Sequence, residues 1–180
     1  MKDKLLQQAK HEYSPKQRFV ALLFLVPIFL ILIPYGLVTL GRMIDRWLKW
    51  PPVPDEPLNL VLGWLLILLG WLLGVWANYS QFTIGRGTPV PLMATQKLIV
   101  QPPFTYCRNP MALGSFIMYT GVAALYRSPG AGVLVLLFAC LLLAYIKRVE
   151  EKEMELRFGQ EYLDYRSRTP FLIPYFWRRS

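Results

Sequence analysis

Charged residues, cysteine and histidine are all scarce in this sequence. Charged residues make up 17% of the 180 residues, whereas about a quarter is typical of a soluble domain. Apolar residues make up 54% of the chain and the mean hydropathy is +0.34. This composition excludes an ordinary soluble domain and indicates a single-domain integral membrane protein, 1–180.

The two cysteines and the single histidine exclude further classes of protein. Cys107 lies in a loop and Cys140 in an apolar run, so we expect no disulfide between them. His11 stands in a polar tail without a second histidine or a cysteine nearby, so we expect no metal site of the usual ligand types.

Apolar runs predict an all-α membrane protein with about four transmembrane helices. A fifth, interfacial helix is possible at either end of the chain. The first two runs exceed the roughly 20 residues that a spanning helix needs. The last two are shorter and are separated by the turn sequence RSPGA, which indicates a helical hairpin. The four predicted spans are about 19–41, 58–82, 110–126 and 132–146.

The segments outside the spans are polar. We expect no cleaved signal peptide, because the first run follows the polar tail 1–18, is too long for a signal core and precedes no small-residue cleavage site. Beyond the last span we predict a helix to about Phe158, a break at Gly159 and an interfacial end, PFLIPYFW.

The basic residues predict the orientation of the chain. Of the 20 lysines and arginines, 16 lie in 1–18, 83–108 and 147–180. The positive-inside rule therefore places both termini in the cytoplasm. We expect the membrane to be a bacterial-type inner or plasma membrane. The net charge of +9 is explained by this topology and by attraction to membrane lipids, so nucleic-acid binding is not expected.

A long connection precedes the third span. The stretch TIGRGTPVPLMATQKLIVQPPFTYCRNP, 83–110, holds two glycines and five prolines and few charges. Since a plain connector needs far fewer residues, this length favours a functional loop.

Glu150 and Glu151 are the first candidates for chemistry, and two interpretations stay open. Adjacent side chains on a helix point about 100° apart, so we expect that both cannot face one spot. In the simpler interpretation, Lys147 pairs with one of them at i+3 or i+4. In the other, one carboxylate faces a cavity at the membrane boundary while a cation holds its neighbour.

The residues at the start of the third span have structural explanations too. Arg108 can extend its guanidinium to the lipid headgroups. Asn109 is a good helix N-cap and Pro110 a good first helical residue. Gly114, with Ser115 and Gly121, suits close helix packing.

Taken together, these motifs resemble the isoprenylcysteine carboxyl methyltransferases and the related membrane phospholipid methyltransferases. The resemblance covers roughly 58–174, and the pattern RFGQEYLDYRSRTPFLIP is its most specific part. The motifs are Gly-x-Gly-Thr-Pro-x-Pro (85–91), Leu-Ile-Val (98–100), Tyr-x-Arg-Asn-Pro-Met-x-x-Gly (106–114), Glu-Glu (150–151) and Phe-Gly-x-Glu-Tyr-x-x-Tyr (158–165).

The resemblance implies a cytoplasmic pocket for S-adenosylmethionine and no metal. The implied catalytic residues are Arg108, Glu150 and Glu151. The implied cofactor-binding residues are Tyr106, Arg108, Asn109, Pro110, Gly114, Glu150 and Glu151. Carboxylates suit the cofactor's ammonium and hydroxyl groups, and an arginine suits its carboxylate.

The methyl acceptor stays open at this stage. Asn109 replaces the family histidine, Ala112 replaces an aromatic residue, and Pro-Pro-Phe (102–104) replaces Gly-Pro-Tyr. We expect a lipid-soluble acceptor, prenylated or phospholipid-like, methylated on oxygen, nitrogen or sulfur. The alternatives are a non-enzymatic membrane scaffold or binding protein, and a sterol-reductase-like enzyme with a nicotinamide cofactor. Transport is disfavoured because the spans carry almost no ionisable residues.

Overall fold

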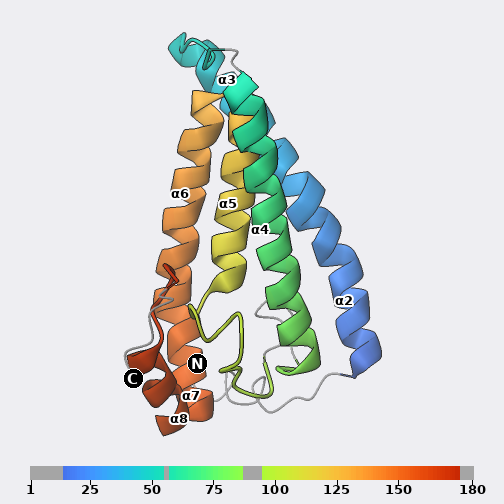
Figure 1. Ribbon diagram of the computed structural model, residues 1–180, viewed down its shortest axis with the longest axis vertical. Helices are drawn as coiled ribbons and strands as arrows, with labels where there is room; N and C mark the ends of the chain where they lie inside the picture. The colour runs from blue at the N-terminus through green and yellow to red at the C-terminus, as the bar shows by residue number, and fades with distance from the viewer. Residues whose placement is uncertain (1–13, 55–56, 87–94, 175–180) are drawn as a thin grey trace.

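All regular secondary structure in the described part of the chain is helical. The computed structural model describes residues 14–54, 57–86 and 95–174, and within these ranges it contains helices and no strand (Figure 1). The predicted all-α class is therefore confirmed. Most of the N-terminal tail, part of the glycine- and proline-rich motif and the end of the sequence PFLIPYFW lie outside the described residues.

Four helical segments form the body of the molecule, and the short helix α8 follows the last of them at one end (Figure 1). The elements are α2 (Pro15–Pro27), η1 (Ile28–Leu32), α3 (Ile33–Leu48), α4 (Pro57–Thr83), α5 (Pro110–Leu125), α6 (Pro129–Tyr145), η2 (Ile146–Glu150), α7 (Glu151–Phe158) and α8 (Gln160–Arg168). Both η elements are π-helical turns inside longer helices.

Three of these segments are long and apolar enough to cross a membrane: Lys16–Leu48, Pro57–Thr83 and Pro129–Phe158. The fourth, α5, has only 16 residues, about 24 Å of helix, and is shorter than the roughly 30 Å hydrocarbon layer. The first helix runs beyond 41 and the last beyond 146, so both are longer than the apolar runs alone indicate. The last ends at Phe158, as predicted, where Gly159 adopts φ +53°.

The first segment contains a π-turn that lies between two prolines. Pro27 immediately precedes the turn and Pro34 follows it. Since proline has no N–H, the regular hydrogen-bond pattern is interrupted there. The phenol of Tyr119, which is fully buried in α5, donates to the carbonyl oxygen of Phe29 in this turn at 2.9 Å. Tyr119 thereby joins α5 to the first segment.

Glycines bring α4 and α5 into close contact. A Cβ placed on Gly70 would lie 2.5 Å from the carbonyl oxygen of Gly114, and one on Gly121 would lie 2.6 Å from that of Gly63. Only residues without a side chain allow two helix backbones to approach so closely. The predicted packing role of Gly114 and Gly121 is therefore confirmed, with Gly63 and Gly70 as their partners.

At the end of the bundle far from α7 and α8, hydrogen bonds join α3 to the start of α6. The Asp45 carboxylate accepts hydrogen bonds from the Ser128 hydroxyl and from the Gly130 N–H, the latter at 2.7 Å. A Cβ on Gly41 would collide with the backbone nitrogen of Ala131. The candidate site lies at the other end of the bundle, near α7 and α8.

Candidate functional site

One large cavity of about 920 Å³ runs from the end of the bundle near α7 and α8 into its apolar interior. Its two ends differ in chemistry. The polar end is lined by Asn78, Gln81, Thr95, Arg108, Asn109, Glu150, Glu151, Glu153, Arg157, Tyr162 and Tyr165. The apolar end is lined by Leu22, Leu25, Val26, Phe29, Leu30, Ile33, Met118 and Phe138, among others. Such a cavity suits a polar ligand beside an apolar one.

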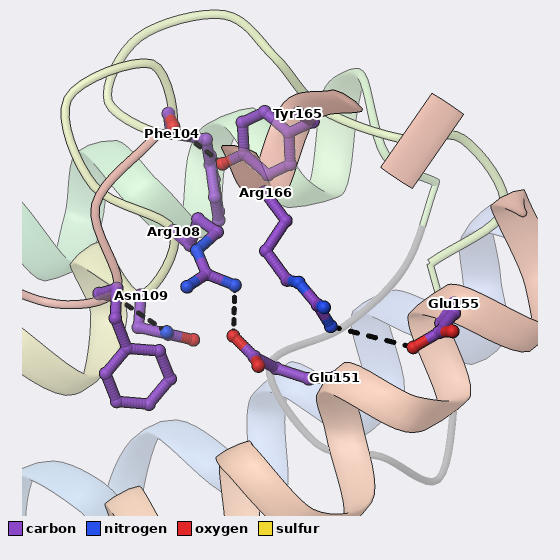
Figure 2. Close-up of polar contacts among 8 residues, drawn as sticks. Phe104, Arg108, Asn109, Glu151, Glu155, Tyr165 and Arg166 are labelled. Atoms are coloured by element: carbon purple, nitrogen blue, oxygen red, sulfur yellow. Dashed lines mark hydrogen bonds and ion pairs between the residues drawn. The ribbon is translucent and has the colours of Figure 1, made fainter. Parts of the chain in front are cut away.

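An ion pair between Arg108 and Glu151 lies at the polar end. Figure 2 shows the guanidinium, from the segment before α5, facing the carboxylate on α7. The two side chains are only 13% and 12% exposed, so each charge depends on the other for compensation. The Nε of Arg108 is buried and has no hydrogen-bond partner among the described residues. Arg108 therefore keeps one donor for a further group.

Glu150 lines the same cavity, but its surroundings differ from those of Glu151. No hydrogen bond or ion pair to Glu150 is present within the described ranges. Its carboxylate can therefore accept hydrogen bonds from an ammonium or from hydroxyl groups of a ligand.

The surroundings of Glu150 and Glu151 match the second interpretation of this pair. Both glutamates line the cavity, and a cation, Arg108, holds Glu151, whereas Glu150 has no ion pair among the described residues. The π-turn η2 covers Ile146–Glu150 and ends directly before Glu151. The simpler interpretation fails, because no ion pair joins Lys147 to either glutamate in the described part of the chain.

Asn109 occupies the N-cap position of α5 but does not cap it with its side chain. Its Nδ2 donates instead to the carbonyl oxygen of Phe171, 62 residues later, at 2.8 Å. The predicted capping role of the side chain is therefore wrong. Pro110 is the first residue of α5, as predicted; it is fully buried and lines the cavity.

The two remaining predicted cofactor-binding residues differ in position. Gly114 lines the cavity, but a Cβ there would also lie 2.8 Å from the carbonyl oxygen of Gly70. Close helix packing thus explains why a glycine, which has no side chain, occupies this position. Tyr106 is not among the cavity-lining residues; its ring makes an edge contact with Trp76, with the centroids 6.4 Å apart. The structure does not bring Tyr106 to the site.

Two tyrosines of α8 belong to the site, and sequence reasoning gave them no role. Tyr162 and Tyr165 line the polar end, and the Tyr165 phenol donates to the carbonyl oxygen of Phe104 at 2.6 Å (Figure 2). Burial raises the pKa of both phenols, and for Tyr162 the Glu151 carboxylate adds to the rise while Arg108 opposes it. Both therefore stay protonated donors at neutral pH. Their spacing of three residues on a polar helix was the available signal.

Arg157 ties α7 to the loop before α5. Its NH2 group lies 3.1 Å from the Glu153 carboxylate, and its NH1 group donates to the carbonyl oxygen of Thr95 at 2.9 Å. Sequence reasoning did not single out Arg157, because its loop partner is 62 residues away.

Cys107 is not available as a nucleophile. The thiol is 1% exposed, and burial raises its pKa although the Asn109 backbone opposes the shift. In the described ranges, no group of three His, Cys, Asp or Glu side chains is placed to hold a metal ion. The lining of the cavity combines charged and polar side chains with an apolar space.

Comparison with known proteins gives a family match over most of this region. The sequence profile of the family described as phospholipid methyltransferase matches residues 58–161, from α4 to the start of α8. No solved structure matches the chain significantly.

Several curated proteins are similar to the chain. Protein-S-isoprenylcysteine O-methyltransferase of Rattus norvegicus is 26% identical over 151 residues, which cover 78% of this chain and 51% of the rat protein. Methanethiol S-methyltransferase 2 of Bradyrhizobium diazoefficiens is 28% identical over 145 residues, 70% of this chain and 52% of that protein. Methanethiol S-methyltransferase of Crocosphaera subtropica is 27% identical over 159 residues, 79% of this chain and 60% of that protein.

The chain spans about half the length of the curated relatives it matches first. The profile match covers both the Arg108 segment and the glutamates, and the similar proteins include isoprenylcysteine methyltransferases, in agreement with the resemblance found in the sequence. This integral membrane chain belongs to the phospholipid methyltransferase family.

Proposed function

We propose that this protein transfers a methyl group from S-adenosylmethionine to a lipid-soluble acceptor at the cytoplasmic face of the membrane. The observation that carries the proposal is the single cavity that joins the Arg108–Glu151 end to an apolar space between the helices. A polar cofactor and an apolar acceptor can meet there without leaving the membrane boundary.

The residues at the polar end fit the groups of the cofactor. When bound, S-adenosylmethionine supplies a methyl group that its sulfonium already activates. Glu150, which has no partner among the described residues, would accept hydrogen bonds from an ammonium or from ribose hydroxyls. The unpartnered Nε of Arg108 would donate to a carboxylate. Glu151 holds the Arg108 guanidinium in place for that contact.

The protein contributes mainly position and exclusion of water. Transfer from a sulfonium needs an in-line approach of the acceptor atom, and orientation of this kind can supply several kcal/mol, roughly 7 or more in favourable cases. If the acceptor is an amine, a nearby base has to take its proton, and the carboxylate of Glu150 is the unpaired candidate. The tyrosines of α8 stay neutral and serve as donors.

The apolar end favours a prenylated or acyl-chain acceptor over a small thiol. Six residues of the first helical segment line it, all aliphatic or aromatic: Leu22, Leu25, Val26, Phe29, Leu30 and Ile33. Methyl transfer to a small thiol, named for the two bacterial relatives, needs no such space and is the second candidate.

Orientation follows from charge. The segments 83–108 and 147–180 supply most residues at the polar end of the cavity. Together with residues 1–18, these segments carry 16 of the 20 lysines and arginines. The positive-inside rule supports a cytoplasmic location for this end and for both termini.

Calorimetric binding of S-adenosylhomocysteine to the detergent-purified protein tests the proposal. We expect binding to the wild type and at least tenfold weaker binding to Glu150→Gln, because the variant loses a charged acceptor. Glu161→Gln, on the exposed side of α8, is the matched control and should bind like the wild type. A folded wild type that does not bind would instead support a non-enzymatic scaffold.

A further inference from the structure

The chain after α8 returns to the start of α5. Three contacts join the two segments. The Arg108 N–H donates to the carbonyl oxygen of Pro170 at 2.9 Å, Asn109 Nδ2 donates to that of Phe171 at 2.8 Å, and the Arg108 guanidinium lies 5.4 Å from the centre of the Phe171 ring. Arg108 and Asn109, which are adjacent in the sequence, are thus both held by the segment after α8.

We propose that Thr169–Phe171 is a strap that positions Arg108 and Asn109 for the cofactor, with Phe171 as its positioning residue. This inference rests on the proposed function, because the cofactor gives the positioning its purpose. Phe171 does not line the cavity, so it acts through Arg108 and Asn109 alone.

The segment before α5 needs such support because it has no regular structure of its own. Arg108 and Asn109 precede the first helical residue, Pro110, and Asn109 adopts φ −126° and ψ 56°, outside the helical region. The partner of the Arg108 N–H is the carbonyl of Pro170. Thr169, where the strap leaves α8, is only 7% exposed, so the strap begins inside the protein.

The strap also determines which side-chain atom of Asn109 is available to a ligand in the cavity. Since Nδ2 donates to the Phe171 carbonyl, Oδ1 is left as an acceptor. Oδ1 accepts no hydrogen bond from the residues that the structure describes, and Asn109 lines the cavity. An N–H or O–H donor of the ligand can therefore bind Oδ1.

Asn109 and the family histidine can make the same contact. An imidazole N–H can donate to the Phe171 carbonyl as the carboxamide does. An aspartate has the same size but no donor, and its carboxylate would face a carbonyl oxygen. The strap therefore predicts that Asn109→His is tolerated and that Asn109→Asp is not.

Hydrogen exchange of the segment around Arg108 tests the strap without a ligand. In Phe171→Leu, which keeps the apolar volume but loses the ring, the Arg108 amide should exchange at least tenfold faster than in the wild type. Phe171→Tyr should restore slow exchange. Ile173→Leu, at a position that is 79% exposed, is the matched control and should not change the rate. Equal exchange in Phe171→Leu and the wild type would overturn the strap.

Binding of S-adenosylhomocysteine supplies the second readout. We expect its Kd to rise about tenfold in Phe171→Leu and in Asn109→Asp, as the loss of one buried hydrogen bond or ring contact allows. Asn109→His and Phe171→Tyr should stay within threefold of the wild type. Wild-type binding that is equally tight in Phe171→Leu and Asn109→Asp would contradict the positioning role. If the wild type does not bind, the proposed function fails and the exchange rates alone decide the strap.

Discussion

Glu150 and Glu151 are neighbours in the sequence but have different surroundings. Glu151 is paired with Arg108 in a partly buried contact, whereas Glu150 lines the cavity without an ion pair among the described residues. We therefore propose that they have different tasks. Glu151 holds a protein cation in place, and Glu150 is left for the groups of a ligand.

A double-mutant cycle tests the coupling of Arg108 and Glu151. Arg108→Gln and Glu151→Gln should each lower the free energy of unfolding in detergent by about 1–3 kcal/mol, because each leaves a poorly hydrated charge unpaired. The double variant should lose clearly less than the sum. The exposed pair Arg166–Glu155, at 3.6 Å and 41% and 48% exposed, is the control and should show almost no coupling. Additive losses for Arg108 and Glu151 would contradict the pairing.

Sequence reasoning identified four residues at the polar end of the cavity but not their contacts. Arg108, Asn109 and the two glutamates stand in recognisable motifs, and all four line the cavity. Their partners lie far away in the chain: Glu151 is 43 residues from Arg108, and Phe171 is 62 from Asn109. A single sequence carries no information on such pairings. Tyr106 was misplaced because it belongs to the same motif while its ring packs on Trp76.

At the scale of helices, the lengths of the apolar runs and the spacing of the glycines predicted structural features correctly, whereas the π-turns were not predicted. The runs predicted four helical segments in the correct order. The turn Ile146–Glu150, which ends directly before Glu151, has no marker residue in the sequence and was not predicted. The turn Ile28–Leu32 does follow a proline, Pro27, but a proline alone does not specify a π-turn.

The contact between α4 and α5 makes a prediction at this scale. In Gly114→Ala, the new methyl group would meet the Gly70 carbonyl at 2.8 Å, so the helices must move apart. We expect the free energy of unfolding to fall by about 1–3 kcal/mol. Gly36→Ala is the control, since no atom lies within 4 Å of a Cβ there; it should be neutral or stabilising by up to about 1 kcal/mol. Thermal unfolding in detergent measures both, and equal stability of the two variants would contradict the close crossing.

At the scale of the whole molecule, the cavity unites elements from both ends of the sequence. The first helical segment supplies much of its apolar end, and α7 and α8 supply much of its polar end. Ala112, where relatives are expected to carry an aromatic residue, also lines this space. Composition and charge predicted a membrane protein, and the resemblance to the methyltransferases implied a pocket, but the extent of the cavity follows only from how the helices pack.

A bulky residue at the apolar end should separate the acceptor from the cofactor. Leu25 lines the cavity, so Leu25→Trp should reduce methyl transfer to a lipophilic acceptor at least tenfold and leave the binding of S-adenosylhomocysteine unchanged. Leu23 lies on the same helix, is 57% exposed and does not line the cavity, so Leu23→Trp is the matched control. An equal effect of both variants would count against an acceptor bound at this end.

Transfer of a labelled methyl group into lipid is the most direct test of the account. Membranes that contain the wild type should convert S-adenosylmethionine with a tritiated methyl group into a labelled product extractable by organic solvent, and Glu150→Gln should reduce that product at least tenfold. A labelled product that is only volatile would indicate a small thiol acceptor and contradict the lipid assignment. No product above that of membranes without the protein, with the wild type shown to be folded, would contradict the methyltransferase activity itself.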